Sequence, residues 1–497
     1  MSVRSLAIPA FALALCLVAR PADSRPGDAD RWLTARLNAL AADPRIAPAR
    51  VGVAVQDVAS GKTLARIRAD EGFNVASCAK LVTSATALWS LGPEYRFKTV
   101  LYAAREPDKP GSGGRSLPGP VVEGDLYLKG FGSPTLDEAD LWQLVDELVD
   151  RGIRAIRGRL VIDESFFDGE RLAPLYDSKS TDSWYRPPNG PLSLGSNAVS
   201  VRVYGGDAPG KPARIVLRPR SSYLTLVDKV TTVVPKRRSW VQVETRARGA
   251  RTEVEVRGRV RVGYRRRAFR RRIEDPGLFT GYALLDVLGR RGIKVAHKDV
   301  VRGKLPPKVR LLAAHYSEPL AVVLRRMNKR SNNFIAEQVL KTVGAEVEGA
   351  PGTWGKGLKV AARFLKTLSI QPSSYTMKNG SGLYDATSFS PTQLVKVLRA
   401  SSLNFRAGAD FVASLPQAGV DGTLGHRFVG SGAERYVRAK TGTLARVVTL
   451  SGYAGAATLR GPIAFSILIN DLPDGKVGEA RQVADDMARA LVQYLER

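Results

Sequence analysis

The chain has 497 residues, of which 44% are hydrophobic and 25% are charged. These values exclude a wholly disordered protein, and the length exceeds that of one ordinary domain, so we expect two or three domains. The formal net charge of +29 admits nucleic acid as a partner class. An export signal at the N-terminus argues against nucleic acid and favours the anionic polymers of a cell envelope.

The N-terminus has the pattern of a secretory signal peptide, which we place at residues 1–23. Arg4 precedes an apolar stretch at residues 6–19, which is shorter than the roughly 20 residues that a membrane-spanning helix needs. Lipid modification of Cys16 is a minor alternative, because Leu15 stands where such a site needs a small side chain. The sequence therefore predicts an exported protein, periplasmic or cell-wall associated, with no transmembrane segment after signal cleavage.

Cysteine and histidine usage limits the possible chemistry. Only Cys78 would remain after loss of the signal, so no internal disulfide is expected. The three histidines, at positions 297, 315 and 426, lack the spacing of metal ligands. We therefore expect no metal and no other cofactor. A Ser-His-Asp triad is not excluded, although few histidines are available for it.

The two ends of the chain predict one antiparallel sheet covered by helices, which is an α+β arrangement. Apolar spacing separates helical from strand-like segments. In chain order the predicted elements are a helix at 30–42, a strand at 51–58, a helix from Ser77 to Gly92-Pro93, strands at 436–441, 447–454 and 463–469, and a helix at 479–495.

The middle of the chain has a different pattern. A loop rich in Pro, Gly and Ser at 106–120 precedes a predicted helix at 138–151 and a strand at 158–162. Residues 199–272 are mostly short alternating runs rich in Arg and Val, which indicate half-buried β-structure. We interpret 101–275 as inserted domains, two nested units, that divide a main domain into 24–100 and 276–497.

Ser77 and Lys80 form the first candidate catalytic element, Ser-Cys-Ala-Lys. A serine hydroxyl needs a neighbouring base before it becomes a good nucleophile. Residues three apart lie on one helix face, so the Lys80 amine would lie close to the Ser77 hydroxyl. A surface Ser/Lys turn is the more frequent explanation of this motif when it occurs alone.

Two further elements follow in the chain. Ser331-Asn332-Asn333 precedes an apolar-spaced helical segment, where a hydroxyl and an amide two positions apart can face one cleft. A helix N-cap is the simpler interpretation of that serine. Lys440-Thr441-Gly442-Thr443 closes a strand-like run. Its lysine can bind a carboxylate, and its glycine permits close approach of a substrate.

The order of these three elements resembles that of β-lactamases and penicillin-binding proteins. The chain looks like a low-molecular-mass class C penicillin-binding protein, of the D-alanyl-D-alanine carboxypeptidase/endopeptidase family. Several further segments are similar to that family. They are Ala76 to Thr83, Gly124 to Leu126, Gly132 to Leu136, Gly158 to Asp163, His315 to Leu320, Asn379 to Leu383 and Ala439 to Gly442.

The resemblance implies a penicillin-binding-protein/β-lactamase-like D,D-peptidase domain with inserted β-rich domains. It implies catalytic roles for Ser77, Lys80, Ser331, Asn333 and Lys440. The backbone N–H groups of Ser77 and Thr443 would form the oxyanion hole, and Thr441, Gly442 and Thr443 would bind substrate. The expected substrates are peptidoglycan stem peptides, the expected inhibitors are β-lactams, and nucleic acid is not an expected partner.

Two other functions are compatible with these residues. A β-lactamase-like serine hydrolase or an esterase needs the same groups, and a catalytically lapsed protein would only bind the cell wall. Separately, residues 236–272 contain two basic clusters, 236–238 and 265–272. A solvated surface is the usual explanation of such runs. We expect them to form a platform for anionic envelope polymers, a feature that the resemblance does not explain.

Overall fold

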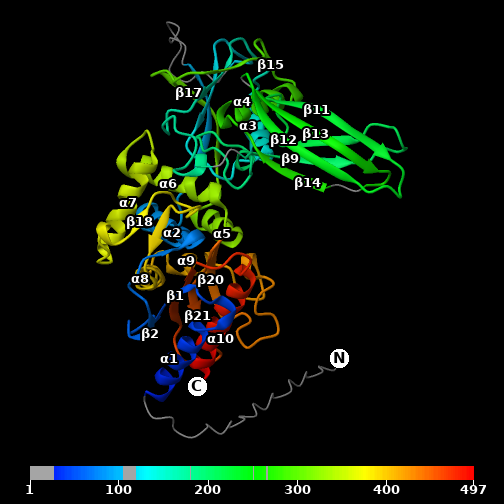
Figure 1. Cartoon of the computed structure of the whole chain (residues 1–497). Helices are drawn as coiled ribbons and strands as arrows, with labels where there is room; N and C mark the ends of the chain where they lie inside the picture. The colour runs from blue at the N-terminus through cyan, green and yellow to red at the C-terminus, as the bar shows by residue number, and fades with distance from the viewer. Residues whose placement is uncertain (1–26, 105–118, 179–180, 250, 265–266) are drawn as a thin grey trace, which may run out of the picture.

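Figure 1 shows a computed structural model of the chain, which describes residues 27–104, 119–178, 181–249, 251–264 and 267–497. The predicted signal peptide at residues 1–23 lies outside the described residues. Within the described part of the chain, no helix is both long and apolar enough to cross a membrane.

The first and last parts of the chain build a five-stranded sheet in the order β2-β1-β22-β21-β20. Every strand pair in it is antiparallel, as predicted. β20 forms one edge, and an edge strand offers a row of backbone N–H and C=O groups to whatever lies beside it. The strands are β1 (Arg50–Asp57), β2 (Thr63–Ile67), β20 (Val437–Leu444), β21 (Val447–Ala454) and β22 (Ile463–Asn470).

Helices cover both faces of this sheet because its strands send alternate side chains into two cores. Val53 and Ile467 join one core, and Ala54 and Leu468 join the other. The first core is closed by α1 (Asp28–Ala41) and α10 (Val477–Glu496), and the second by α2 (Ala79–Leu91), α5 (Leu320–Arg330), α6 (Asn333–Glu348), α7 (Trp354–Thr367), α8 (Pro391–Leu403) and α9 (Gly408–Ser414). The predicted α+β domain is confirmed.

An inserted region follows α2 and occupies the upper half of Figure 1. Its mixed sheet has the order β16-β8-β6-β4-β17. The elements are β4 (Lys98–Ala104), β6 (Leu126–Gly130), α3 (Glu138–Asp150), β8 (Leu160–Asp163), α4 (Pro276–Arg290), β16 (Val300–Arg302) and β17 (Val309–Tyr316). Because β17 pairs with β4 and α4 packs in the same core, this region extends past the boundary at residue 275 that the sequence predicted.

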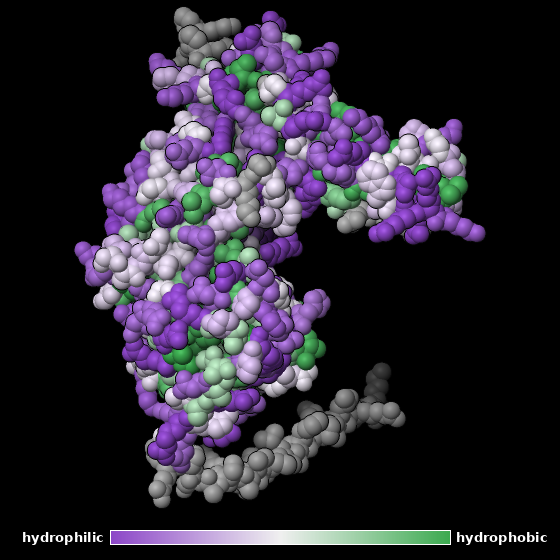
Figure 2. All heavy atoms as spheres, viewed as in Figure 1, coloured by the Kyte–Doolittle hydropathy of each residue, from purple (hydrophilic) through white to green (hydrophobic). Residues whose placement is uncertain are grey.

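Two three-stranded sheets, β10-β9-β14 and β11-β13-β12, form the part of the insert that projects to one side. Val254, Val256 and Val260 of β13 are buried, so the predicted half-buried β-structure is confirmed. The free end of this part is largely hydrophilic (Figure 2). The strands are β9 (Ala198–Tyr204), β10 (Arg214–Arg218), β11 (Leu224–Val233), β12 (Trp240–Arg248), β13 (Arg251–Arg261) and β14 (Arg267–Arg272).

The remaining short strands form two small three-stranded sheets. They are β3 (Phe73–Asn74), β18 (Thr376–Met377) and β19 (Thr387–Phe389) in the main domain, and β5 (Val121–Val122), β7 (Ala155–Ile156) and β15 (Lys294–Val295) in the insert.

Candidate active site

Ser77 lies in a 3-10 turn, Ala76–Cys78, directly before α2. The sequence predicted that Ser77 begins the α-helix itself. The tighter turn forms because the Asn74 side chain accepts the N–H of Ala76 at 2.9 Å. Ala76 has a φ of 44°, a left-handed conformation that residues other than glycine rarely adopt. Such backbone strain is frequent at functional sites, where the surrounding structure holds it in place.

Lys80 is fully buried on the first turn of α2. Its Nζ lies 3.0 Å from Ser77 Oγ, 2.7 Å from Asn333 Oδ1 and 2.8 Å from the carbonyl oxygen of Ser381. Burial, together with the positive charge of Lys440, holds the pKa of Lys80 well below its ordinary value. The structure thus favours a neutral amine beside the nucleophile.

The three partners of Lys80 match the bonding capacity of a neutral amine. Its two N–H groups can donate to the oxygens of Asn333 and Ser381, which only accept here. The nitrogen lone pair is then directed toward the hydroxyl of Ser77. This arrangement lets Lys80 take the hydroxyl proton as Ser77 attacks a substrate.

The second element lies at the junction of α5 and α6. Ser331 ends α5 with a φ of 52°, and Asn333 is the first residue of α6. The N-cap of α6 is Asn332, whose side chain accepts the N–H of Ile335 at 3.1 Å. Ser331 is therefore not the N-cap of α6, and its hydroxyl accepts a hydrogen bond from Lys440 at 2.8 Å.

Asn333 is held from both ends of its amide. Its Oδ1 accepts from Lys80, and its Nδ2 donates to the backbone carbonyl of Tyr185 at 3.0 Å. The sequence predicted a catalytic role for Asn333. The structure adds that it positions the proposed base.

The third element runs along the edge strand β20. Lys440 is fully buried, and its Nζ donates to Ser331 Oγ at 2.8 Å and to the carbonyl oxygen of Thr441 at 2.7 Å. Burial lowers the pKa of Lys440 to about 8. Lys440 and Ser331 therefore form one polar pair beside the Lys80 cluster.

Gly442 brings β20 against the nucleophile turn. A Cβ at this position would collide with the Thr449 hydroxyl and would lie 3.0 Å from the backbone nitrogen of Ser77. Only glycine allows this approach. Thr443, the next residue, is exposed. The oxyanion hole expected from the backbone N–H groups of Ser77 and Thr443 stays a prediction.

Sequence reasoning missed two residues that support Lys80. The segment 379–383 was assigned no role, yet the carbonyl of Ser381 accepts a hydrogen bond from the base. Glu337 holds that segment in place, because its carboxylate accepts the backbone N–H groups of Gly380 at 2.9 Å and Ser381 at 2.8 Å. One available signal was a carboxylate among the apolar residues that begin α6.

Glu337 is itself fully buried and well satisfied. Besides the two backbone groups, it accepts Trp354 Nε1 at 2.9 Å and lies 3.4 Å from the hydroxyl of Tyr176. Tyr176 comes from the insert and also lies 2.9 Å from Ser381 Oγ. Its contact shows that the insert contributes to the catalytic surroundings.

Among the residues that the structure describes, the other chemistry-bearing side chains form no second centre. Cys78 is buried, its thiol pKa is raised by burial, and its sulfur contacts the Lys440 carbonyl at 3.3 Å. It lies at the start of α2 and packs against β20 and β21, where burial keeps the thiol protonated. Across the described ranges, no group of His, Cys, Asp and Glu side chains is placed to hold a metal ion.

This fold and this pair of lysines define a class of protein. Serine enzymes that form an acyl-enzyme with a lysine as base have this fold and these lysines. Penicillin-binding proteins and β-lactamases make up this class. The model of the D-Ala-D-Ala carboxypeptidase 3 (S13) family matches residues 33–494. The chain belongs to this family. The predicted class C penicillin-binding protein and the predicted serine peptidase are confirmed.

Individual relatives agree with this assignment. The chain is 31% identical over 482 residues to a D-alanyl-D-alanine carboxypeptidase of Actinomadura sp. (strain R39), covering 92% of this chain and 84% of the relative. The crystal structure of penicillin binding protein 4 (dacB) from Haemophilus influenzae superimposes with a TM-score of 0.74, 21% identity and coverage of 92% and 98%. A complex of that protein with a β-lactam gives a TM-score of 0.71, 22% identity and coverage of 91% and 98%.

Proposed function

We propose that the chain hydrolyses the terminal D-Ala-D-Ala bond of peptidoglycan stem peptides, or the corresponding cross-link, with Ser77 as nucleophile and Lys80 as general base. The observation that carries this proposal is the 3.0 Å contact between Ser77 Oγ and the fully buried Lys80 amine. The name of the Actinomadura relative supports the substrate class.

In the first half-reaction, Ser77 Oγ bonds to the carbonyl carbon of the penultimate D-Ala as Lys80 accepts the hydroxyl proton. The backbone N–H groups of Ser77 and Thr443 stabilise the oxyanion. The peptide C–N bond then breaks as Ser331 relays the proton that Lys80 accepted to the nitrogen of the leaving amine, so Ser331 and Lys80 both return to their starting protonation states. The 2.8 Å hydrogen bond that Lys440 donates to Ser331 supports this route, because it orients the Ser331 hydroxyl.

In the second half-reaction, water hydrolyses the ester of Ser77 and restores the hydroxyl. Before acylation, Lys440, with Thr441 and Thr443, binds the terminal carboxylate of the substrate, and this carboxylate leaves with the released amine. A buried cation is suited to that task, since its attraction for a carboxylate is weakly screened. Gly442 lets the substrate lie close to the strand. No step requires a metal or a cofactor.

β-Lactams acylate Ser77 by the same route in this proposal. The β-lactam complex of the Haemophilus protein supports it. A β-lactamase or esterase would release the penicillin product rapidly, whereas a peptidase would keep a long-lived acyl-enzyme. A lapsed wall-binding protein would not form the acyl-enzyme at all. The buried, fully partnered Lys80 favours an active enzyme over a lapsed one.

The decisive experiment is labelling with a fluorescent penicillin, followed by mapping of the modified peptide. We expect a stable label on Ser77, and we expect Ser77→Ala to abolish it without changing the thermal unfolding. A label on Ser331 or Ser381 would contradict the assignment. Parallel assays on a soluble D-Ala-D-Ala peptide and on a cross-linked dimer would separate carboxypeptidase from endopeptidase activity.

We also propose that the protein is exported and acts in the periplasm or at the cell wall, which is where its substrate would be. Family membership supports this location. N-terminal sequencing of the mature protein from an envelope fraction is the test, with an expected start near residue 24. Retention of Met1 on the cytoplasmic protein would contradict it.

The basic residues of the insert divide into two groups in the structure. Arg246 and Arg248 pair with Glu253, and Arg271 pairs with Asp182 at 3.0 Å. These arginines stabilise the insert and are poor candidates for binding a polymer. Arg265 and Arg266 lie outside the described residues.

The turn between β11 and β12 is better suited to bind an anionic polymer. It carries Lys236, Arg237 and Arg238, all exposed, and no ion pair engages them within the part of the chain that the structure describes. We therefore assign the proposed attraction for anionic envelope polymers within 236–272 chiefly to this turn.

A further inference from the structure

A hollow of about 1290 Å³ opens in the insert beside α4, β10 and β15. In Figure 1, α4 and β15 lie at the upper end of the molecule, far from α2 and β20, which border the catalytic groups. None of the residues that line the hollow belongs to the catalytic network. Its volume exceeds the roughly 300–1,000 Å³ of ordinary small-ligand sites. It is therefore large enough to hold a second ligand.

One face of α4 forms the apolar floor of this hollow. Tyr282, Leu285 and Gly289 follow at intervals of three and four residues, so they lie on one side of the helix. Tyr282 and Leu285 are only half-buried, whereas Leu284 and Leu288 on the inner side are fully buried. A Cβ on Gly289 would meet nothing within 4 Å, so this glycine leaves the hollow open.

Aliphatic side chains form the walls opposite this floor. Ile215 and Leu217 of β10 and Val295 of β15 line the hollow and are half-buried. Each also packs against the core of the insert. An apolar ligand in the hollow would therefore remove these partly exposed surfaces from water, which is favourable in proportion to the area covered.

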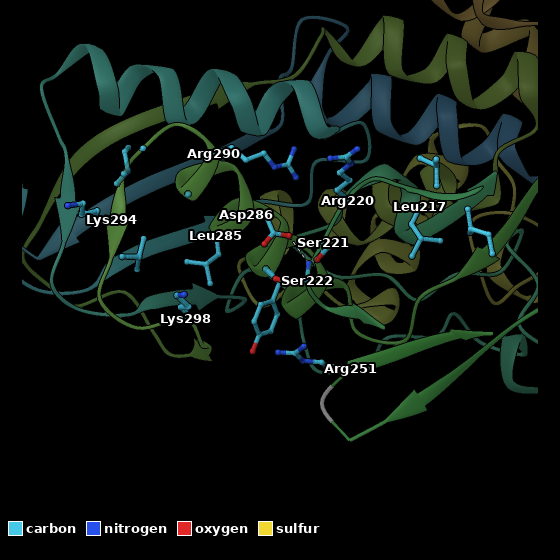
Figure 3. A pocket seen from close by; sticks show the side chains of 17 residues that line it. Leu217, Arg220, Ser221, Ser222, Arg251, Leu285, Asp286, Arg290, Lys294 and Lys298 are labelled. Carbon is cyan, nitrogen blue, oxygen red and sulfur yellow. Dashed lines mark hydrogen bonds between the residues drawn. The ribbon is translucent and has the colours of Figure 1, made fainter. Parts of the chain in front are cut away.

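Positive charge surrounds the apolar surface. Figure 3 shows Arg220, Arg251, Arg290, Lys294 and Lys298 arranged around Leu285 and Asp286. Five cationic side chains thus face one carboxylate. That carboxylate already has a hydrogen-bond partner, because Asp286 accepts the backbone N–H of Ser222 at 2.7 Å.

Most of these cations lack an anionic partner. Arg290 lies 3.4 Å from a Glu138 oxygen. Arg220, Arg251, Lys294 and Lys298 form no ion pair with any carboxylate among the described residues, and all four are exposed. These four side chains form the rim of the hollow, and their charge is available to an external anion.

The combination of floor and rim restricts the ligand. A glycan would stack its sugar rings on aromatic side chains, but Tyr282 is the single aromatic residue in the lining. A purely polar polyanion would gain nothing from the aliphatic walls. An anion with an attached hydrocarbon chain uses both features, and arginine recognises phosphate with paired N–H groups.

We infer that this hollow binds the phosphate headgroup and the adjoining acyl chain of an anionic phospholipid, and so attaches the insert to a membrane surface. The apolar floor of α4 takes the chain, and the rim of Arg220, Arg251, Lys294 and Lys298 takes the phosphate. This site is separate from the peptidase site and does not depend on the function proposed for it.

The test uses the full chain with vesicles of phosphatidylcholine, with and without phosphatidylglycerol. We expect sedimentation only with phosphatidylglycerol vesicles. A soluble short-chain phosphatidylglycerol should compete, whereas glycerol phosphate, which has the same charge without the chain, should not. Equal competition by glycerol phosphate would overturn the inference in favour of a simple anion site.

Two variants probe the rim and the floor separately. Lys294→Gln with Lys298→Gln should weaken vesicle binding by roughly fivefold for each charge removed. Gly289→Leu places an extra side chain in the hollow, at a position where a Cβ meets nothing within 4 Å, and should weaken competition by the short-chain lipid while the net charge is unchanged. Binding by Gly289→Leu equal to that of the parent would show that the lipid does not enter the hollow.

A matched control separates this site from general charge attraction. Lys366 and Lys378 are exposed on the main domain, and their double change to Gln removes the same charge. We expect this control to bind phosphatidylglycerol vesicles as the parent does. An equal loss in the control would overturn the inference. The thermal unfolding midpoint should be the same in every variant, which verifies that each one is folded.

Discussion

The carboxylate of Glu337 accepts the backbone N–H of Ser381 at 2.8 Å, and the carbonyl of Ser381 accepts a hydrogen bond from Lys80 at 2.8 Å. One residue of the backbone thus connects a buried carboxylate to the proposed base. Glu337 acts as a positioning residue in this arrangement, because it touches neither Ser77 nor a substrate. Its negative charge also opposes the other influences on Lys80, since it raises the pKa that burial and Lys440 lower.

Glu337→Gln should therefore change the pH dependence of acylation. Removal of the negative charge lets the pKa of Lys80 fall further, so the acid limb of the rate profile should move to lower pH. The amide cannot accept all the hydrogen bonds of the carboxylate, and an unsatisfied buried group costs about 1–3 kcal/mol. We expect a lower melting temperature as well. The rate of penicillin acylation as a function of pH is the measurement.

Glu346→Gln is the matched control, because Glu346 lies on the same helix and accepts the Tyr95 hydroxyl at 2.8 Å near the surface. It should leave the pH profile unchanged. If Glu337→Gln lowered only the stability and left the acid limb in place, Glu337 would be a structural residue without influence on the base.

Lys80→Arg should abolish most acylation although the charge of the protonated side chain is kept. A guanidinium stays protonated in proteins and cannot accept the proton of Ser77. We expect the acylation rate to fall roughly 10²- to 10⁴-fold, the usual contribution of a positioned general base. Stopped-flow penicillin binding gives the rate, and thermal unfolding shows whether the variant is folded. Near-parental acylation in a folded variant would assign the proton transfer to another group.

The two buried lysines should give acylation by the peptide substrate a bell-shaped pH profile. The reaction needs Lys80 neutral, so the rate rises as pH passes upward through its lowered pKa. It also needs Lys440 protonated to bind a carboxylate, so the rate falls as pH passes through the Lys440 pKa of about 8. The dependence of kcat/KM on pH reports both groups in the free enzyme.

A substrate without the terminal carboxylate tests the assignment of the alkaline limb. A thioester that lacks this group does not need the charge of Lys440. The pH profile of kcat/KM for the thioester should keep the acid limb and should lack the fall near pH 8. An alkaline limb that is the same for both substrates would mean that Lys440 does not act through the carboxylate.

The sequence predicted those helices and strands whose hydrophobic pattern and bounding turn residues lie within the element itself. The strand β21 was predicted without error and β22 to within one residue, because each is a buried apolar run bounded by turn residues. The end of the insert was not predicted. α4 is apolar on most of its surface, with Phe279, Leu284 and Val287 all buried. The apolar sequence of such a helix predicts that the helix is buried, but it does not predict which core the helix joins.

The same limit applies to the active site. The predicted groups Ser77, Lys80, Ser331 and Lys440 lie together because each belongs to a short motif with its own local signal. Glu337 belongs to no such motif: its one sequence signal is a carboxylate among apolar residues, and its partners Gly380 and Ser381 lie 43 and 44 positions away in the chain. The turn of Ser77 depends likewise on Asn74, whose side chain fixes it before α2 begins. Pairings of this kind become visible only once the chain has folded.

Replacement of Lys236, Arg237 and Arg238 by glutamine should weaken attachment of the protein to isolated envelope material. The three side chains are exposed on the turn between β11 and β12, at the free end of the projecting part of the insert (Figure 1). Exposed charges are screened over about 8 Å at physiological ionic strength. The difference from the parent should therefore be large at low salt and small at high salt. Sedimentation with envelope material over a range of salt concentrations is the measurement.

The control removes three charges elsewhere, by changing Arg36, Lys366 and Lys378 to glutamine. These residues are exposed on the main domain, so attachment should stay close to that of the parent. Both triple variants should cleave a small soluble D-Ala-D-Ala peptide at the parental rate, because that substrate needs only the Ser77 site. If both variants lost attachment equally, the attraction would come from the overall charge of +29. If the 236–238 variant lost activity on the small peptide, the insert would be coupled to the active site, a connection that the contact of Tyr176 with Ser381 makes physically available.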